Sequence, residues 1–197
     1  MPTWIKVAKG SFRMGLTEDE ARAYVIANAT IGMTPERILD EQPAAEHTVE
    51  DFQLAKSPLT NVEYMRFVEG GGYQSLDLFD ELRSECGTDA ESLLRTKFVD
   101  QSGQAGPASW EQGQYTAGKD DHPVHGISFY EAMAAARYFD ARLPSEIEWE
   151  FAARAPDGRH FPWGNEIPDR NIANFKLNKI GSTSSCGMFS SGTSALG

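Results

Sequence analysis

Cysteine is scarce in this sequence, and the two cysteines that occur are far apart. Cys86 and Cys186 lie 100 positions apart, and neither belongs to a CxxC pair. Disulfide scaffolds and cysteine-rich zinc sites need several cysteines at short, regular spacings. The sequence therefore excludes both kinds of structure and predicts two free thiols.

Long apolar runs are also missing. A membrane-spanning helix needs about 20 consecutive apolar residues, and no stretch of this chain approaches that length. The first residues, MPTWIK, lack the basic and then apolar layout of a secretory signal peptide. We therefore expect a cytoplasmic protein that does not interact with a membrane.

Basic residues are few relative to acidic ones. The 18 Lys and Arg residues stand against 29 Asp and Glu, which gives a formal net charge of −11. A protein with this balance has little general attraction for nucleic-acid phosphates or anionic lipids. We expect no nucleic-acid partner. The length of 197 residues and the 40% hydrophobic content are typical of one globular domain.

Three helices are predicted by the same start signal, in which a hydroxyl residue stands three positions before a glutamate. This capping box satisfies two backbone amides at a helix start. The predicted helices are residues 61–69 after Thr60, 129–140 after Ser128 and 146–154 after Ser145. A polar stretch at 18–39 predicts one or two further helices, the first capped by Thr17 and the second opened by Thr34-Pro35-Glu36.

The remaining sequence predicts short strands and much irregular structure. Strand candidates, mostly bounded by glycine or proline, span 3–7, 11–14, 48–56 and 124–127. Residues 74–121 mix helical stretches at 76–86 and 90–94 with loops, and they are interpreted as an elaboration on the core. The prediction is one α+β domain over residues 1–197.

Five motifs then resemble those of one known family. They are GSFRMG at 10–15, KSPLTNVEY at 56–64, HPVHGISFYEA at 122–132, RLPSEIEWEFAAR at 142–154 and FPWG at 161–164. In order and spacing they resemble motifs of the formylglycine-generating enzyme, or sulfatase-modifying factor, family. The resemblance implies the family's variant of the C-type-lectin-like fold, which is α+β with little regular secondary structure.

The resemblance also implies a chemistry, which is oxygen-dependent oxidation of a substrate cysteine by a copper-binding cysteine pair. In the family, a sequence similar to residues 190–197 is followed by a GNVWEW strand and by an RGGS segment near the cysteine pair. Neither motif occurs in this sequence. We therefore expect a bacterial, C-terminally incomplete domain with part of its core missing. Such a chain lacks the copper ligands and is inactive by itself.

Two alternatives to an oxidase fragment remain open at this stage. One is a non-catalytic binding or scaffold module on the same fold, with a protein or peptide partner, because fold alone does not determine function. The other is a ligand-display protein with variable C-terminal loops, although this sequence contains no such region. Oligomeric state is not predicted.

A calcium-binding position is implied by the segment NIANF at 171–175, which resembles a segment that binds calcium in the family. The resemblance assigns the Asn174 side chain and the Phe175 carbonyl as ligands, and oxygen atoms of this kind suit a hard cation. Because the partner aspartate loop is not recognisable, a turn asparagine is the alternative explanation of Asn174.

The four histidines do not predict a metal centre. His122 and His125 are three positions apart in an extended segment, a spacing that sends their side chains to opposite faces. His47 and His160 are isolated, so no triad of two histidines and a carboxylate can be assigned. This argues against the ergothioneine-synthase branch of the same superfamily.

Other candidate groups have structural explanations. Glu146, Glu148 and Glu150 are explained by helix capping and solvation rather than by acid–base catalysis. Trp163 is predicted to pack in the core with its indole N–H on a backbone carbonyl. Cys186 lies in a loop without a nearby base and is predicted to be inert. No catalytic residue is assigned.

Overall fold

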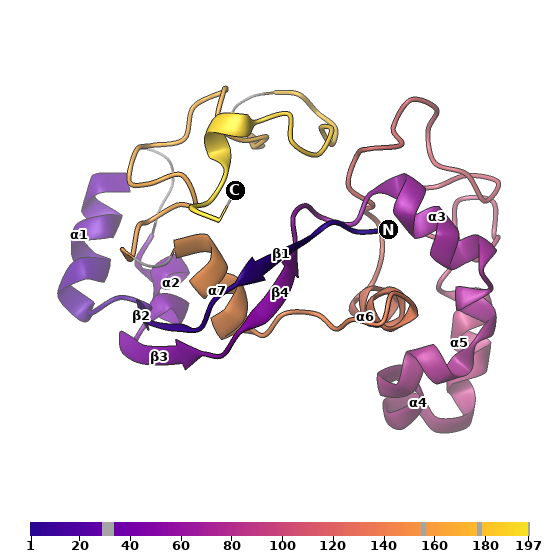
Figure 1. The fold of residues 1–197 in the computed structure, drawn as a ribbon. Coiled ribbons are helices and arrows are strands. Elements are labelled where there is room, and N and C mark those ends of the chain that lie inside the picture. The colour runs from indigo at the N-terminus through magenta and orange to yellow at the C-terminus, as the bar shows by residue number, and fades with distance from the viewer. Residues whose placement is uncertain (29–33, 155–156, 177–178, 197) are drawn as a thin grey trace. The chain divides into compact units, whose positions relative to one another are not determined.

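A computed structural model describes residues 1–28, 34–154, 157–176 and 179–196 (Figure 1). Short strands and two helices fill the first 55 residues and helices follow them, which confirms the mixed α and β class. The chain divides into two compact units. Unit 1 comprises Met1–Ile5, Leu54–Leu143 and Pro168–Ser191, and unit 2 comprises Lys6–Gln53, Pro144–Ile167 and Gly192–Gly197. Each unit thus joins segments that are distant in the sequence.

In the described residues, four short strands form two separate two-stranded sheets. The strands are β1 (Trp4–Val7), β2 (Gly10–Met14), β3 (Ala45–Val49) and β4 (Phe52–Ala55). β1 pairs with β4, and β2 pairs antiparallel with β3, so that Arg13 lies opposite Glu46. The strands predicted at 3–7 and 11–14 are therefore confirmed to within one residue at each end.

Two strand predictions need correction. Residues 48–56 are not one strand, because the chain turns between β3 and β4 where the Asp51 carboxylate accepts a hydrogen bond from the Lys9 backbone N–H at 2.7 Å. Residues 124–127 are all described and form no strand. Proline at 123 has no N–H to donate, and Gly126 has a left-handed φ of 72° that interrupts the extended backbone.

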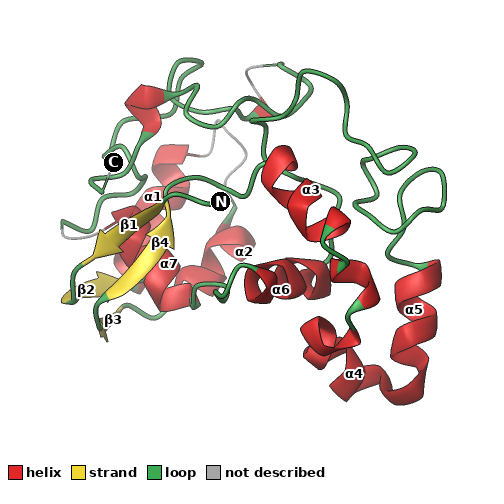
Figure 2. Ribbon diagram, turned by 45° about the vertical axis from the view of Figure 1, so that its right-hand side comes forward, coloured by secondary structure: helices red, strands yellow, loops and turns green. Residues whose placement is uncertain are grey.

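The described part of unit 2 also contains three α-helices, α1 (Glu18–Asn28), α2 (Pro35–Ile38) and α7 (Glu146–Arg154). The polar stretch therefore does form two helices, and residues 29–33 between them lie outside the described residues. The predicted Thr17 cap is confirmed, since its hydroxyl accepts from the Glu20 N–H and the Glu20 carboxylate accepts from the Thr17 N–H. Helix α7 packs against β2 and β3 (Figure 2). There, the Phe151 and Phe12 rings pack edge to face, with 5.4 Å between their centroids.

Unit 1 is built mainly from helices. They are α3 (Asn61–Glu69), α4 (Asp80–Cys86), α5 (Ala90–Thr96) and α6 (Phe129–Tyr138). Helix α3 has the predicted bounds, and α6 ends two residues earlier than predicted, before Asp140 adopts a left-handed φ of 56°. Reciprocal capping boxes form at Thr60 and Ser128, as predicted. No helix among the described residues is long and apolar enough to cross a membrane.

The core of unit 1 is rich in aromatic side chains. Its buried members are Tyr64, Met65, Phe67, Tyr73, Phe79, Leu82, Ala90, Leu94, Trp110, Ala134 and Ala135. The predicted helical stretches at 76–86 and 90–94 are present as α4, α5 and a preceding 3₁₀ turn. Because Phe79, Leu82 and Trp110 belong to this cluster, segment 74–121 supplies a large part of the core.

Candidate functional site

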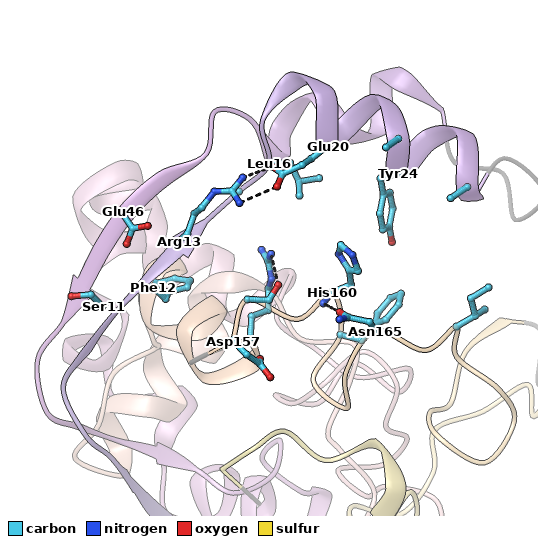
Figure 3. Close-up of a pocket in the computed structure, with 17 residues that line it drawn as sticks. Ser11, Phe12, Arg13, Leu16, Glu20, Tyr24, Glu46, Asp157, His160 and Asn165 are labelled. Carbon is cyan, nitrogen blue, oxygen red and sulfur yellow. Dashed lines mark hydrogen bonds and ion pairs between the residues drawn. The ribbon is translucent and has the colours of Figure 1, made fainter.

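A pocket of about 840 Å³ lies within unit 2 (Figure 3). One wall is a single face of α1, which presents Glu20, Ala23, Tyr24 and Ala27 at helical spacing. The other wall is the loop at 157–167. Figure 3 shows Arg13 and Glu46 toward one end, and Tyr24, His160 and Asn165 toward the other. The pocket therefore has a charged end and an aromatic end.

Arg13 organises the charged end. Its guanidinium forms an ion pair with both oxygens of Glu20, and Glu46 lies opposite it on the neighbouring strand. The hydrogen bonds that Glu20 accepts from Arg13, and then those from Thr17, lower the pKa of the Glu20 carboxyl to about 2. Glu20 thus caps α1 and joins that helix to β2 while it stays charged.

Acid should weaken the attachment of α1 through Glu20. A carboxyl whose pKa is lowered on folding adds stability above its unfolded pKa, and this contribution is lost as the pH falls toward its folded pKa. For Glu20 the window runs from its ordinary value of 4.5 down to about 2. We expect urea unfolding to show a smaller loss of stability across this window in Glu20→Gln than in the unchanged protein. Equal losses in the two proteins would contradict this role.

A second ion pair ties α7 to the start of the pocket loop. The Glu150 and Arg154 side chains are only 12% and 15% exposed and pair at helical i,i+4 spacing. Glu150 also accepts from the Gly15 N–H at 3.4 Å, and Arg154 donates to the Arg159 carbonyl at 2.8 Å. The explanation of Glu150 by solvation was wrong, because its carboxylate holds two backbone segments together.

Glu148 of α7 and Trp163 of the pocket loop have the structural hydrogen bonds that the sequence predicts. The Glu148 carboxylate accepts from the Ser145 N–H at 2.8 Å and the Ser145 hydroxyl accepts from the Glu148 N–H, which completes the third predicted capping box. The indole N–H of Trp163 donates to the Glu166 carbonyl at 3.0 Å, as predicted. The Trp163 ring stacks on Phe161 and is half-buried rather than in the core.

A buried polar chain crosses the core of unit 1. The Tyr64 and Tyr73 hydroxyls lie 2.9 Å apart, and Tyr73 donates to Glu131 at 2.6 Å. The other oxygen of Glu131 accepts from the Ser128 N–H at 2.6 Å. Burial raises the pKa of both tyrosines, so they remain neutral donors. This chain of hydrogen bonds links the start of α6 to α3. The sequence predicted only the contact between Ser128 and Glu131 that caps α6.

The calcium ligands implied by the resemblance lie in unit 1. The Asn174 amide nitrogen donates to the Ser182 carbonyl at 2.8 Å and to the Ser184 hydroxyl at 2.7 Å, so this side chain holds its segment to residues 182–184. Ca²⁺ takes six to eight oxygen ligands. No group of three or more His, Cys, Asp or Glu gathers anywhere in the described part of the chain. A calcium site at Asn174 and Phe175 would need further oxygen ligands.

The histidines are dispersed. One ring nitrogen of His122 lies 2.9 Å from the Thr183 hydroxyl, the His160 ring packs on Tyr24, and the His47 ring lies 6.5 Å from Phe12. These contacts account for three of the four histidines as packing or hydrogen-bonding groups. None of them joins a metal-binding cluster in the residues that the structure describes.

Both thiols are free and half-buried in different surroundings. Cys86 ends α4 and packs against the aromatic core. Cys186 points at the Pro58 carbonyl, with 3.7 Å between sulfur and oxygen. Burial raises the pKa of the Cys186 thiol, and the nearby Asp121 adds to this effect. A raised pKa lowers the fraction of reactive thiolate at neutral pH.

Cys186 should therefore react slowly. We expect iodoacetamide to alkylate it more slowly in the folded protein than in the urea-unfolded chain, as followed by peptide mass spectrometry at pH 8. Asp121→Asn should accelerate the reaction of the folded protein by removing a repelling charge. A folded-state rate above the unfolded rate would show an activated thiol and contradict this explanation.

The comparisons with known proteins agree with the motifs. Residues 1–196 match the family described as sulfatase-modifying factor enzyme 1-like domain. A hercynine oxygenase of Mycolicibacterium smegmatis is 31% identical over 144 residues, which are 71% of this chain and 32% of that protein. A formylglycine-generating enzyme of Mycobacterium tuberculosis is 31% identical over 182 residues, covering 80% of this chain and 53% of that protein.

A bovine protein named inactive C-alpha-formylglycine-generating enzyme 2 is 33% identical over 144 residues, covering 66% of this chain and 47% of that protein. The chain thus spans about a third to a half of the length of these relatives. Strand β2 and the capped starts of α3, α6 and α7 coincide with four of the five motifs. The chain belongs to the sulfatase-modifying factor family.

The pocket in unit 2 is what sequence analysis missed. The available signal was the row Glu20, Ala23, Tyr24 and Ala27 on one face of a predicted helix, where two alanines leave room beside an aromatic ring. The lack of an assignable triad of two histidines and a carboxylate argued against the ergothioneine-synthase branch, yet hercynine oxygenases are among the similar proteins.

Proposed function

We propose that these 197 residues form the structural and binding part of a formylglycine-generating-type domain and carry no oxidase chemistry of their own. The family chemistry, oxidation of a substrate cysteine by oxygen, needs a copper-binding cysteine pair according to the resemblance. One observation supports the proposal above all. Cys86 packs against the aromatic core, whereas Cys186 points at the Pro58 carbonyl. Both thiols are free, and no group of three or more His, Cys, Asp or Glu gathers in the described residues.

The alternative is a non-catalytic module that binds a protein or peptide. Two observations favour it, namely the pocket in unit 2 and the inactive bovine relative. With either function we also propose a cytoplasmic location, a bacterial origin and the C-type-lectin-like variant of the fold. Calcium at Asn174 and Phe175 is also part of it, and further oxygen ligands would be required there.

The test of the proposal is an activity assay on the 197-residue chain. A cysteine-containing peptide is incubated with the protein, oxygen and copper, and formylglycine is measured by mass spectrometry. We expect no conversion above that of copper alone. Conversion that disappears in Cys86→Ser or Cys186→Ser would overturn the proposal. A longer protein containing a cysteine pair after these residues should be active, whereas a binding module should stay inactive.

Calcium is tested separately by titration calorimetry. The calcium proposal expects heat of binding in the unchanged protein and none in Asn174→Ala. If the two proteins behave alike, the family position does not carry over to this chain and Asn174 is a turn residue.

A further inference from the structure

The pocket in unit 2 has room because of two small residues in α1. Ala23 and Ala27 lie on the face that carries Glu20 and Tyr24, and the loop at 157–167 stands opposite them. A larger side chain at either alanine would occupy part of the 840 Å³. The volume falls in the range of small-molecule sites, which is about 300–1,000 Å³. The pocket can therefore hold a side chain or a small ligand.

The charges that line the pocket leave an excess of one negative charge. The charged lining residues are Arg13, Glu20, Glu46, Arg154 and Asp157. Four of these five groups have specific ionic partners, since Arg13 pairs with Glu20, Arg154 with Glu150, and Asp157 with Arg159. Glu46 is the additional carboxylate at the charged end. It faces an arginine whose charge Glu20 already balances. The pocket thus favours a cation over an anion.

The opposite end offers aromatic faces. The centroids of the Tyr24 and His160 rings lie 5.5 Å apart, and Phe161, which follows His160 in the loop, also lines the pocket. His160 is held by its backbone N–H, which donates to the Asn165 side-chain oxygen at 2.8 Å. Aromatic faces accept apolar bodies and attract cations through their quadrupole. An occupant with both characters would use both ends of the pocket.

We propose that this pocket binds an organic cation with an apolar or aromatic body, its charged group near Glu46 and its body beside Tyr24 and His160. The basic side chain of a peptide and a free organic amine share this chemistry. The proposal names a ligand class for unit 2. It does not depend on cysteine oxidation, so a negative result here would leave the absence of oxidase chemistry untouched.

Two matched pairs of probes test the proposal by titration calorimetry or by NMR shift perturbation. The peptide pair is acetyl-Phe-Arg-amide and acetyl-Phe-citrulline-amide, which differ in charge but hardly in shape. The small-molecule pair is benzyltrimethylammonium and benzyl alcohol. We expect at least one cation to bind about fivefold tighter than its neutral counterpart, the size of one exposed cation–π or ionic contact. Binding by the peptide alone or by both cations identifies the source.

Three variants locate the binding. Glu46→Gln should weaken cation binding by about two- to fivefold, whereas Glu50→Gln, which removes the same charge outside the pocket, should not. Ala23→Leu fills the pocket without changing any charge and should abolish binding. Equal affinities for cation and neutral probe, equal losses in the two glutamine variants, or unchanged binding in Ala23→Leu would each overturn the proposal. Circular dichroism confirms that each variant is folded.

Discussion

Replacing Gly72 with alanine is expected to destabilise the protein by about 3 kcal/mol, the upper part of the range for overpacking a core. A Cβ atom at Gly72 would lie well under 3.0 Å from three carbons of the Phe67 ring, closer than real Cβ atoms approach. Phe67 is fully buried between Tyr64, Tyr73 and Tyr138, so its ring has no free space to move into. Urea unfolding with a two-state fit measures the change in free energy.

Gly118→Ala is the control for Gly72→Ala. Gly118 has a left-handed φ of 78°, but nothing lies within 4 Å of the position that a Cβ atom would take there. Alanine at this position should cost only the backbone strain, about 1 kcal/mol. If both variants lost the same stability, close packing of Phe67 against the Gly72 backbone would not be the cause.

Replacing Glu131 with alanine is the second change with a large expected effect, about 3 kcal/mol. The carboxylate is 3% exposed and accepts hydrogen bonds from the Tyr73 hydroxyl and the Ser128 N–H. Loss of a helix cap costs about 1 kcal/mol, and each buried donor left without a partner costs about 1–3 kcal/mol. The variant therefore weakens α6 and the polar chain at the same time.

Glu131→Gln is the matched control, because glutamine preserves the shape. Its oxygen can accept from the Ser128 N–H while its nitrogen donates to the Tyr73 hydroxyl, which then donates to Tyr64. We expect a loss of only about 1 kcal/mol in urea unfolding. A glutamine variant as unstable as the alanine variant would mean that the negative charge, rather than the hydrogen bonding, is what the core requires.

Local signals in the sequence predicted the local structure well. The three capping boxes depend on residues three positions apart, so the starts of α3, α6 and α7 could be predicted without any knowledge of the tertiary structure. The glycines that end α3 are equally local. The strand prediction at 124–127 was wrong for reasons that are also local. Pro123 has no N–H to donate, and Gly126 has a left-handed φ of 72° that interrupts the extended backbone.

The candidate site depended on long-range contacts and could not be predicted. Tyr73 and Glu131 are 58 positions apart, and the pocket joins a helix at 18–28 to a loop at 157–167. Glu150 looked like a solvated helix residue because its partner at Gly15 is 135 positions away. The family, in contrast, could be recognised from the sequence, because its motifs lie along the chain in a fixed order.

Copper binding tests the central claim most directly, which is that these residues carry the family scaffold without its thiol chemistry. Soft thiolate ligands in close pairs bind Cu(I) tightly, whereas Cys86 and Cys186 lie in different surroundings. Titration of the reduced protein with Cu(I) against a coloured chelator should show no competition for the metal. Tight binding of one Cu(I) per chain, lost in both Cys86→Ser and Cys186→Ser, would contradict the account.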